Sequence, residues 1–311
     1  MITPMSDPIV SIIMPTYKRP DLIRRAIGSI LSQSYQDFEI VVVDDSPDTL
    51  TKEAVVAIGD ARIRYVKPPE RLGFIEAKNE GVREAAPRSR YVAFCDDDDE
   101  YLPGFLEKTT TLLDQNPHLM AVVTDNEMRQ QGGLVIKRYP CEDKKFWRVS
   151  IGNGCVVRKG VFTKLNIWYD TAMPFEDLDF GVRLTKDYPW GAIHDVLRIY
   201  YGYPAQKGDS LTTAFTKETP VEKLEAFVKK NLALYQAAGP EALAWIYGIT
   251  GKHLMRAGHR KIGLGYLWKS LVLNPKPSSF IYYGIALIAP WMFYSLTLLI
   301  WKNRILGMFK Q

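Results

Sequence analysis

Short apolar runs alternate with helical patterns along the first half of the chain, and this alternation constrains the fold more than any other feature. The apolar runs predict strands at residues 10–14, 38–43, 63–66, 91–95 and 120–124. The stretches between them predict helices over residues 21–32, 51–58 and 75–85. Strands that alternate with helices form βαβ units, so the sequence predicts an α/β fold whose mainly parallel sheet is covered by helices.

The rest of the chain has two different characters. Residues 126–215 are rich in glycine and aromatic residues and predict mixed strands and loops beside the sheet. From residue 218 the pattern is helical, with breaks at Gly239-Pro240 and Asn274-Pro275. We therefore expect one domain over residues 1–217 and a helical C-terminal extension over residues 218–311.

The charge of the chain is unevenly distributed. Residues 221–311 contain 12 of the 40 Lys/Arg residues and 3 of the 35 Asp/Glu residues. The net charge is therefore +9 in this region and −4 in the remainder of the chain. A basic region favours an anionic partner. Because the same region is rich in aromatic and aliphatic residues, we expect a membrane surface with anionic lipid and no nucleic acid.

A long uncharged segment lies near the C-terminus. Residues 280–301 are 22 residues without a charge, and a helix of that length spans roughly 33 Å. Pro290 interrupts the segment, and Lys302, Arg304 and Lys310 follow it. If the preceding domain is cytosolic, a full span would carry these three positive charges across the membrane, against the positive-inside tendency. We therefore favour a helix in the membrane interface over a single span or packing against the protein's own core.

Cysteine and histidine spacing indicates no zinc site and no disulfide framework. Cys95, Cys141 and Cys155 form no CxxC pair. The histidines have no metal-ligand spacing, so we expect structural or surface roles for His118, His194, His253 and His259. Residues 1–8 lack the basic and apolar regions of a signal peptide, and we expect none.

Four consecutive aspartates, Asp96–Asp99, follow the apolar run at 91–95. The carboxyl end of a strand is where open α/β sheets bind ligands. Mg²⁺ and Mn²⁺ prefer carboxylate oxygens, and Mg²⁺ is often shared with substrate phosphates. The alternative is a solvated acidic turn that caps a helix starting near Leu102.

Two other strand ends carry polar, turn-forming residues. The first strand is followed by Pro15 to Pro20, and the second by Asp44 to Asp48. Three such ends at one edge of a sheet indicate a nucleotide site. Since GxGxxG and GxxxxGK[ST] motifs are absent, metal and basic side chains would have to meet the phosphate charge.

In combination these motifs resemble family 2 glycosyltransferases, which have the GT-A fold. The resemblance covers residues 8–215 and rests on VSIIMPTYKRPDLIRRAIGSILSQSY, FEIVVVDDSPD, RLGFIEAKNEGV, YVAFCDDDDEYLPGFLE and PFEDLDFGVRL. It implies a nucleotide-sugar half at about 8–125, an acceptor half at about 126–217, and sugar transfer with inversion. The implied partners are a nucleotide-sugar donor, in the family most often a UDP-sugar, and a glycan or lipid-linked acceptor. We expect this activity at the cytoplasmic face of the cell membrane; the sequence is compatible with an oligomer.

The resemblance also assigns the donor site. Asp44 or Asp45 would recognise the base, and the pocket wall would come from Pro15, Thr16, Tyr17 and Arg19. Arg71 and Lys78 would reach the diphosphate, although the family usually has arginine where Lys78 stands. The alternatives are a helix N-cap at Asp45 or Ser46 and a solvated helix face for Lys78.

Metal and catalytic roles follow from the same resemblance. Asp98 is expected to bind Mg²⁺ or Mn²⁺ directly. Asp96 is the second ligand or contacts ribose, and Asp97 shapes the turn of the donor site. Asp177 matches the family's catalytic base, with Glu176 in reserve; acidic residues in a first helical turn are also common for dipole reasons alone.

A loop at residues 203–212 resembles one that closes over the site, through Gln206, Lys207 and Ser210. Many family members carry a histidine in this loop, and this chain does not. Gly152-Asn153-Gly154 would line the acceptor side or form an ordinary turn.

Two rival functions use the same features. A sugar nucleotidyltransferase shares the sheet and acidic ligands but usually brings a glycine-rich, basic N-terminal loop that this chain lacks. A non-catalytic scaffold would use the helical C-terminus and bind no sugar nucleotide.

Overall fold

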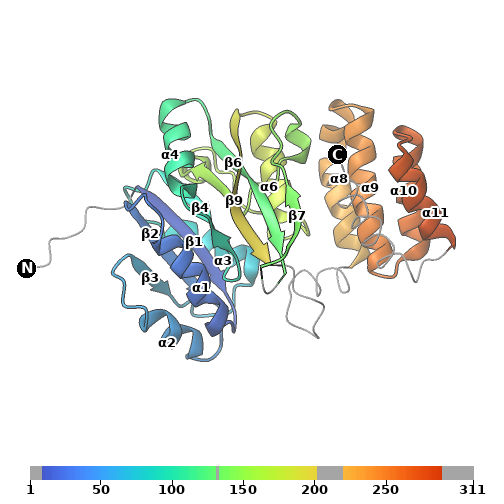
Figure 1. Ribbon diagram of the computed structural model, residues 1–311. Coiled ribbons are helices and arrows are strands. Elements are labelled where there is room, and N and C mark those ends of the chain that lie inside the picture. The colour runs from blue at the N-terminus through green and yellow to red at the C-terminus, as the bar shows by residue number, and fades with distance from the viewer. Residues whose placement is uncertain (1–8, 131–132, 202–219, 289–311) are drawn as a thin grey trace, which may run out of the picture. The chain divides into compact units, whose positions relative to one another are not determined.

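The computed structural model describes residues 9–130, 133–201 and 220–288 (Figure 1). The chain divides into two compact units. The sheet unit comprises residues 1–171 and 176–202, and the helical unit comprises residues 172–175 and 203–311.

In the part of the sheet unit that the structure describes, nine strands form a single sheet. The strands are β1 (Val10–Thr16), β2 (Phe38–Asp44), β3 (Ile63–Val66), β4 (Tyr91–Phe94), β5 (Glu100–Tyr101), β6 (Ala121–Arg129), β7 (Val135–Tyr139), β8 (Cys155–Arg158) and β9 (Trp190–Tyr201). Their order is β3-β2-β1-β4-β8-β6-β9-β5, and β7 pairs with β6. Neighbours from β3 to β4 are parallel, as are β6 and β9, whereas β8, β7 and β5 pair antiparallel with their neighbours. This is the mixed α/β sheet that the sequence predicts.

Helices cover both faces of the sheet (Figure 1). They are α1 (Pro20–Leu31), α2 (Leu50–Val56), α3 (Phe74–Glu84), α4 (Phe105–Gln115), α5 (Gly160–Thr163) and α6 (Glu176–Thr185), with a 3-10 helix at Phe146–Arg148. Ile12 and Met14 of β1 pack with α1, α2 and α4, and the intervening Ile13 packs with α3, α5 and α6. Since successive side chains of a strand point to opposite faces, the three consecutive apolar residues Ile12, Ile13 and Met14 serve both faces.

Most predicted elements are confirmed, and the differences lie near the aspartates and in the middle of the chain. The helix after the aspartates begins at Phe105, because β5 and a turn through Gly104, whose φ is +83°, come first. Strand β6 continues to Arg129, beyond the predicted end at Thr124, because its polar second half pairs with β7 and β9.

Strand register brings the three polar strand ends together. Thr16 of β1 lies opposite Asp44 of β2, and Ile13 lies opposite Phe94 of β4. The residues that follow Phe94, including the four aspartates, therefore emerge at the same edge as Thr16.

The helical unit contains α8 (Val221–Ala237), α9 (Pro240–Arg256), α10 (Arg260–Leu273) and α11 (Pro277–Ile288) (Figure 1). Both predicted breaks are confirmed, since Gly239 precedes α9 and Asn274 ends α10. In its core the Phe175 ring packs edge-on against Phe227 and the imidazole of His253.

Several large apolar side chains of α10 and α11 are exposed: Trp268, Val272, Phe280, Ile281 and Leu287. Within the described residues, none of the helices combines the length and apolar character needed to cross a bilayer. Most of the uncharged segment at 280–301 lies outside the described residues, which end at 288.

Candidate functional site

The aspartate turn is anchored to the first strand through Asp97. The Thr16 hydroxyl donates to Asp97 Oδ2 at 2.7 Å, and Arg19 Nη1 donates to Asp97 Oδ1 at 3.0 Å and to Asp98 Oδ2 at 2.9 Å. Asp97 is buried, and burial raises the pKa of its carboxyl to about 7 although the Arg19 charge opposes the rise. Asp97 therefore holds the turn in place, and Thr16 and Arg19 serve this turn directly.

Asp99 is held from the other side of the sheet unit by Arg198 of β9. Arg198 Nε donates to Asp99 Oδ2 at 2.9 Å; Asp99 is buried, and Arg198 is half-buried. Burial acts to lower the pKa of Arg198, but Asp99 and Asp96 outweigh it and raise the pKa, so the guanidinium stays charged. Sequence reasoning missed Arg198; the signal was an arginine between Leu197 and Ile199 in a strand.

Three of the four aspartates could hold a cation. Oxygen atoms of Asp96, Asp98 and Asp99 all lie within 4.8 Å of one another. Asp96 Oδ1 is buried and has no hydrogen-bond partner within the described chain. A buried oxygen without a partner is costly unless a cation satisfies it, so these residues fit the Mg²⁺ or Mn²⁺ that the resemblance implies.

A pocket of about 310 Å³ opens beside the loop that follows β1. Its wall includes Tyr17, Asp45, Ser46 and Arg71, with Pro47, Lys67, Pro68, Pro69 and Glu70. The Arg71 guanidinium lies 4.4 Å from the centre of the Tyr17 ring. The structure thus brings together Tyr17, Asp45 and Arg71, whereas Pro15 is buried within β1.

Asp44, the last residue of β2, and Asp45, which follows it, make different contacts. Asp45 accepts from the backbone N–H of Leu72 at 3.1 Å and of Gly73 at 2.6 Å, which fixes the loop before α3. Asp44 is fully buried and accepts from the Tyr65 hydroxyl at 2.7 Å. Helix α2 is preceded by Thr49, so neither Asp45 nor Ser46 is its N-cap.

Lys78 is buried, which excludes a solvated helix face for it. Its Nζ lies 3.3 Å from Glu176 Oε1 and 4.3 Å from the centre of the Phe74 ring. Burial acts to lower the pKa of Lys78, but Glu176, Asp96 and Asp177 outweigh it and raise the pKa. A positive charge therefore lies among the carboxylates of Asp96, Glu176 and Asp177.

Asp177 stands in the first turn of α6 and is held by two donors. The Ser150 hydroxyl donates to Asp177 Oδ2, and the Leu178 N–H lies 2.8 Å from Oδ1. Gly152 passes close by, since a Cβ added there would lie 3.1 Å from the Asp177 Cβ. Beside it, burial raises the pKa of Glu176, and Lys78 opposes the rise. Ser150, like Arg198, was missed because its role depends on a contact across 27 residues.

The predicted loop residues Gln206, Lys207 and Ser210 lie outside the described residues.

Comparison with known proteins places this geometry in context. Residues 11–153 match the model of glycosyl transferase family 2. An uncharacterised glycosyltransferase of Methanocaldococcus jannaschii is 27% identical over 64% of this chain and 73% of its own length. A UDP-Glc:α-D-GlcNAc-diphosphoundecaprenol β-1,3-glucosyltransferase of Escherichia coli is 33% identical over 36% of this chain, which spans 44% of that relative.

Among solved structures, a mannosyltransferase from Pyrobaculum calidifontis in complex with GDP-mannose and Mn²⁺ is similar, with a TM-score of 0.56 and 18% identity. The likeness covers 96% of this chain and 87% of that one. It confirms the GT-A type of fold that the sequence resemblance implies.

Proposed function

Because the chain belongs to glycosyl transferase family 2, we propose that it transfers a sugar, with inversion, from a UDP-sugar to a glycan or lipid-linked acceptor. The observation that carries this proposal is the acidic cluster at the carboxyl edge of the sheet, where a buried Asp96 oxygen has no hydrogen-bond partner among the described residues. One short loop links this cluster to the pocket, since Tyr17 lines the pocket and Arg19 binds the aspartates.

The donor base would enter the pocket lined by Tyr17, Asp45 and Arg71. An aromatic ring offers a stacking surface for any base. Each Asp45 oxygen accepts one backbone N–H, and a carboxylate oxygen has a second lone pair that a base N–H could use. Asp44 also accepts one hydrogen bond at each oxygen, but it is fully buried, so a base could not reach its remaining lone pairs.

The donor diphosphate would lie at Asp96 and Asp98, the residues that would hold Mg²⁺ or Mn²⁺, with Asp99 beside them. When bound, such an ion neutralises charge on phosphate oxygens and on the leaving diphosphate. Arg19 and Lys78 supply fixed positive charge at the same edge, and Arg71 supplies more at the pocket.

Asp177 would accept the proton of the acceptor hydroxyl. An inverting transfer is a single displacement, so one carboxylate must act on the face opposite the leaving group. The hydrogen bonds from Ser150 and from the Leu178 N–H orient the Asp177 carboxylate. Glu176 is occupied by the buried Lys78, which supports Asp177 as the base and Glu176 as a residue that positions Lys78.

Residues 218–311 would attach the enzyme to the cytoplasmic face of the membrane, with residues 1–217 carrying out catalysis. The support is the excess of basic residues in 221–311, the exposed apolar side chains of α10 and α11, and the diphosphoundecaprenol acceptor that the Escherichia coli relative's name states. Peripheral attachment suits a surface of this kind.

A screen of sugar nucleotides with Mg²⁺ or Mn²⁺ for released nucleotide tests the proposal. We expect Asp98→Asn and Asp177→Asn each to reduce transfer by at least about 10²-fold, the scale of general acid–base catalysis. Asp187→Asn is the matched control, because Asp187 is exposed just after α6. Full transfer by either site variant, or release of pyrophosphate from a nucleoside triphosphate and a sugar phosphate, would contradict the proposal.

A further inference from the structure

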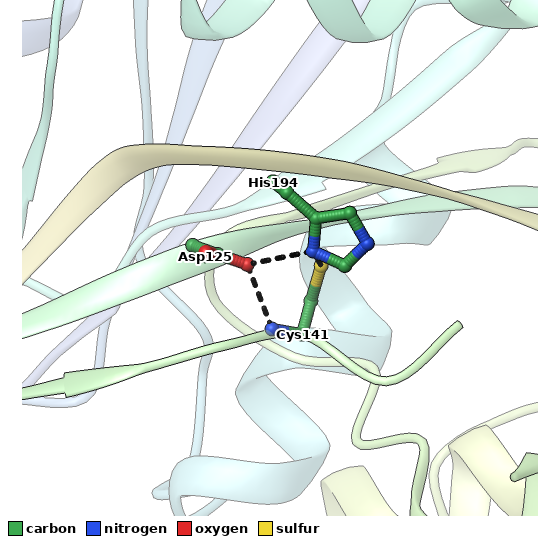
Figure 2. A group of neighbouring side chains, drawn as sticks. All are labelled: Asp125, Cys141 and His194. Atoms are coloured by element: carbon green, nitrogen blue, oxygen red, sulfur yellow. Dashed lines mark hydrogen bonds and ion pairs between the residues drawn. The ribbon is translucent and has the colours of Figure 1, made fainter. Parts of the chain in front are cut away.

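A second cluster of metal-ligand side chains lies in the sheet unit, and the function proposed above does not use it. It consists of Asp125 on β6, Cys141 after β7 and His194 on β9, whose ligand atoms all lie within 4.8 Å of one another. Figure 2 shows the three side chains converging from these separate segments. We propose that Asp125, Cys141 and His194 form a zinc site.

The spacing of the donor atoms suits tetrahedral coordination. Cys141 Sγ lies 3.7 Å from His194 Nδ1, and Asp125 Oδ1 lies 3.4 Å from the same nitrogen. Bonds to tetrahedral zinc are about 2.1 Å for N or O and about 2.3 Å for S. Such bonds place a nitrogen ligand roughly 3.4 Å from an oxygen ligand and roughly 3.6 Å from a sulfur ligand.

Neighbouring groups orient two of the ligands in the way that a metal requires. The Cys141 backbone N–H donates to Asp125 Oδ1 at 2.8 Å (Figure 2). His194 Nε2 lies 3.4 Å from Asp143 Oδ2, so Asp143 can accept the Nε2 proton and leave Nδ1 unprotonated toward the cluster. A carboxylate behind a ligating histidine is the usual outer partner of a zinc site.

A β-bulge presents His194 to the other two side chains. Thr124 pairs with Ile193, but Asp125 pairs with Val196, so His194 and Asp195 are extra residues on β9. Bulges commonly re-aim a side chain in this way. His194 is 54% exposed, which gives an ion access from solvent.

The ligand set selects the metal. A thiolate with imidazole and one carboxylate suits zinc, whereas Mg²⁺ and Mn²⁺ take oxygen ligands. The cluster is therefore chemically distinct from Asp96, Asp98 and Asp99, which offer oxygen alone. With three protein ligands, the fourth position would hold water, and the ion would tie the segment after β7 to β6 and β9.

Titration of the full-length protein with Co²⁺, a spectroscopic substitute for zinc, tests the site. A thiolate-to-cobalt absorption band should saturate at one equivalent, and Zn²⁺ should displace it. The band should vanish in Cys141→Ser, and it should persist in His118→Gln, a variant of an exposed histidine remote in sequence from all three ligands. Asp143→Asn should weaken binding by about 10–100-fold.

Circular dichroism would verify that each variant is folded. If Cys141→Ser fails to fold, His194→Gln serves instead, because His194 is largely exposed; it should weaken cobalt binding and change the band. Absence of a thiolate band, or a band unchanged in either variant, would overturn the proposal. The loss of the band in Cys141→Ser separates this cluster from the acidic site, because Cys141 is not among the residues of the acidic site.

Discussion

Individual side-chain contacts hold the acidic turn in shape. Among them, we expect the ion pair of Arg198 with Asp99 to contribute most to stability. Asp99 is buried, at 4% exposure, and Arg198 is only 14% exposed. Removing one member of a buried ion pair leaves the other charge uncompensated, which costs about 3–5 kcal/mol. We expect Arg198→Leu to lower the free energy of unfolding by this amount, measured by urea unfolding without added metal.

The control for this prediction is the ion pair of Lys108 with Asp195. Its side chains are 50% and 55% exposed, and exposed pairs contribute about 0–1 kcal/mol. Lys108→Ala should therefore change the free energy of unfolding by no more than about 1 kcal/mol. Equal losses in the two variants would contradict the role assigned to Arg198.

At the scale of elements, Gly181 lets α6 lie close to the loop at residues 149–151, and this approach positions Asp177. A Cβ on Gly181 would lie 2.1 Å from the Val149 carbonyl oxygen, which is backbone and cannot yield as a side chain would. Gly181→Ala should destabilise the fold by about 1–3 kcal/mol and reduce kcat, since the loop also carries Ser150.

Gly28→Ala in α1 is the matched control for that substitution. No atom lies within 4 Å of a Cβ added there, and alanine is favoured over glycine in a helix by roughly 0.5–1 kcal/mol. We expect this variant to be at least as stable as the original protein, with unchanged kcat. Steady-state kinetics and thermal unfolding of the two variants test this prediction. A Gly181→Ala protein with unchanged kcat and stability would contradict the role assigned to Gly181.

Helix α9 carries a half-buried histidine, His253, that makes stability depend on pH. Burial, with Arg256 and Lys252 nearby, lowers the pKa of His253 to about 4. Below its ordinary pKa of about 6.5, the unfolded chain takes up a proton that the folded chain does not, so stability falls as the pH falls from about 6.5 to about 4. At about 1.4 kcal/mol per pH unit, the loss reaches about 3 kcal/mol.

His253→Gln should flatten this part of the pH profile, measured by urea unfolding at several pH values. His118→Gln should leave the profile unchanged, because His118 is exposed. Protonation of carboxylates affects both variants alike, so the difference between them isolates His253. A profile of the His253 variant that parallels the original protein would refute the assignment.

At the scale of the whole molecule, the charge asymmetry and the apolar surface of the helical unit predict membrane binding by the full chain. Vesicles with anionic lipid should bind the protein more tightly than zwitterionic vesicles, and added salt should weaken binding. Trp268 is 51% exposed on α10, and Trp268→Ser should weaken vesicle binding by about tenfold.

Leu50→Ser provides the comparison, since Leu50 is 56% exposed on α2 of the sheet unit and should not affect vesicle binding. Co-sedimentation with vesicles of the two compositions gives both affinities. Equal binding to both kinds of vesicle, or equal losses in both variants, would refute the proposed attachment surface.

The elements of the first half could be predicted from the sequence, because local periodicity encodes strands such as 63–66 and the helix near 75–85 directly. The sequence also shows which strand ends carry polar side chains and which family motifs they form. These features depend on neighbours within a few residues, and such neighbours are visible in a linear chain.

The contacts that those side chains make, by contrast, depend on the three-dimensional fold. Arg198 meets Asp99 across 99 residues, and Lys78 meets Glu176 across 98. The bulge that brings His194 to Asp125 depends on how β9 pairs with β6. Local pattern carries no information about such pairings, because strand order and register follow from burying both faces of the sheet at once.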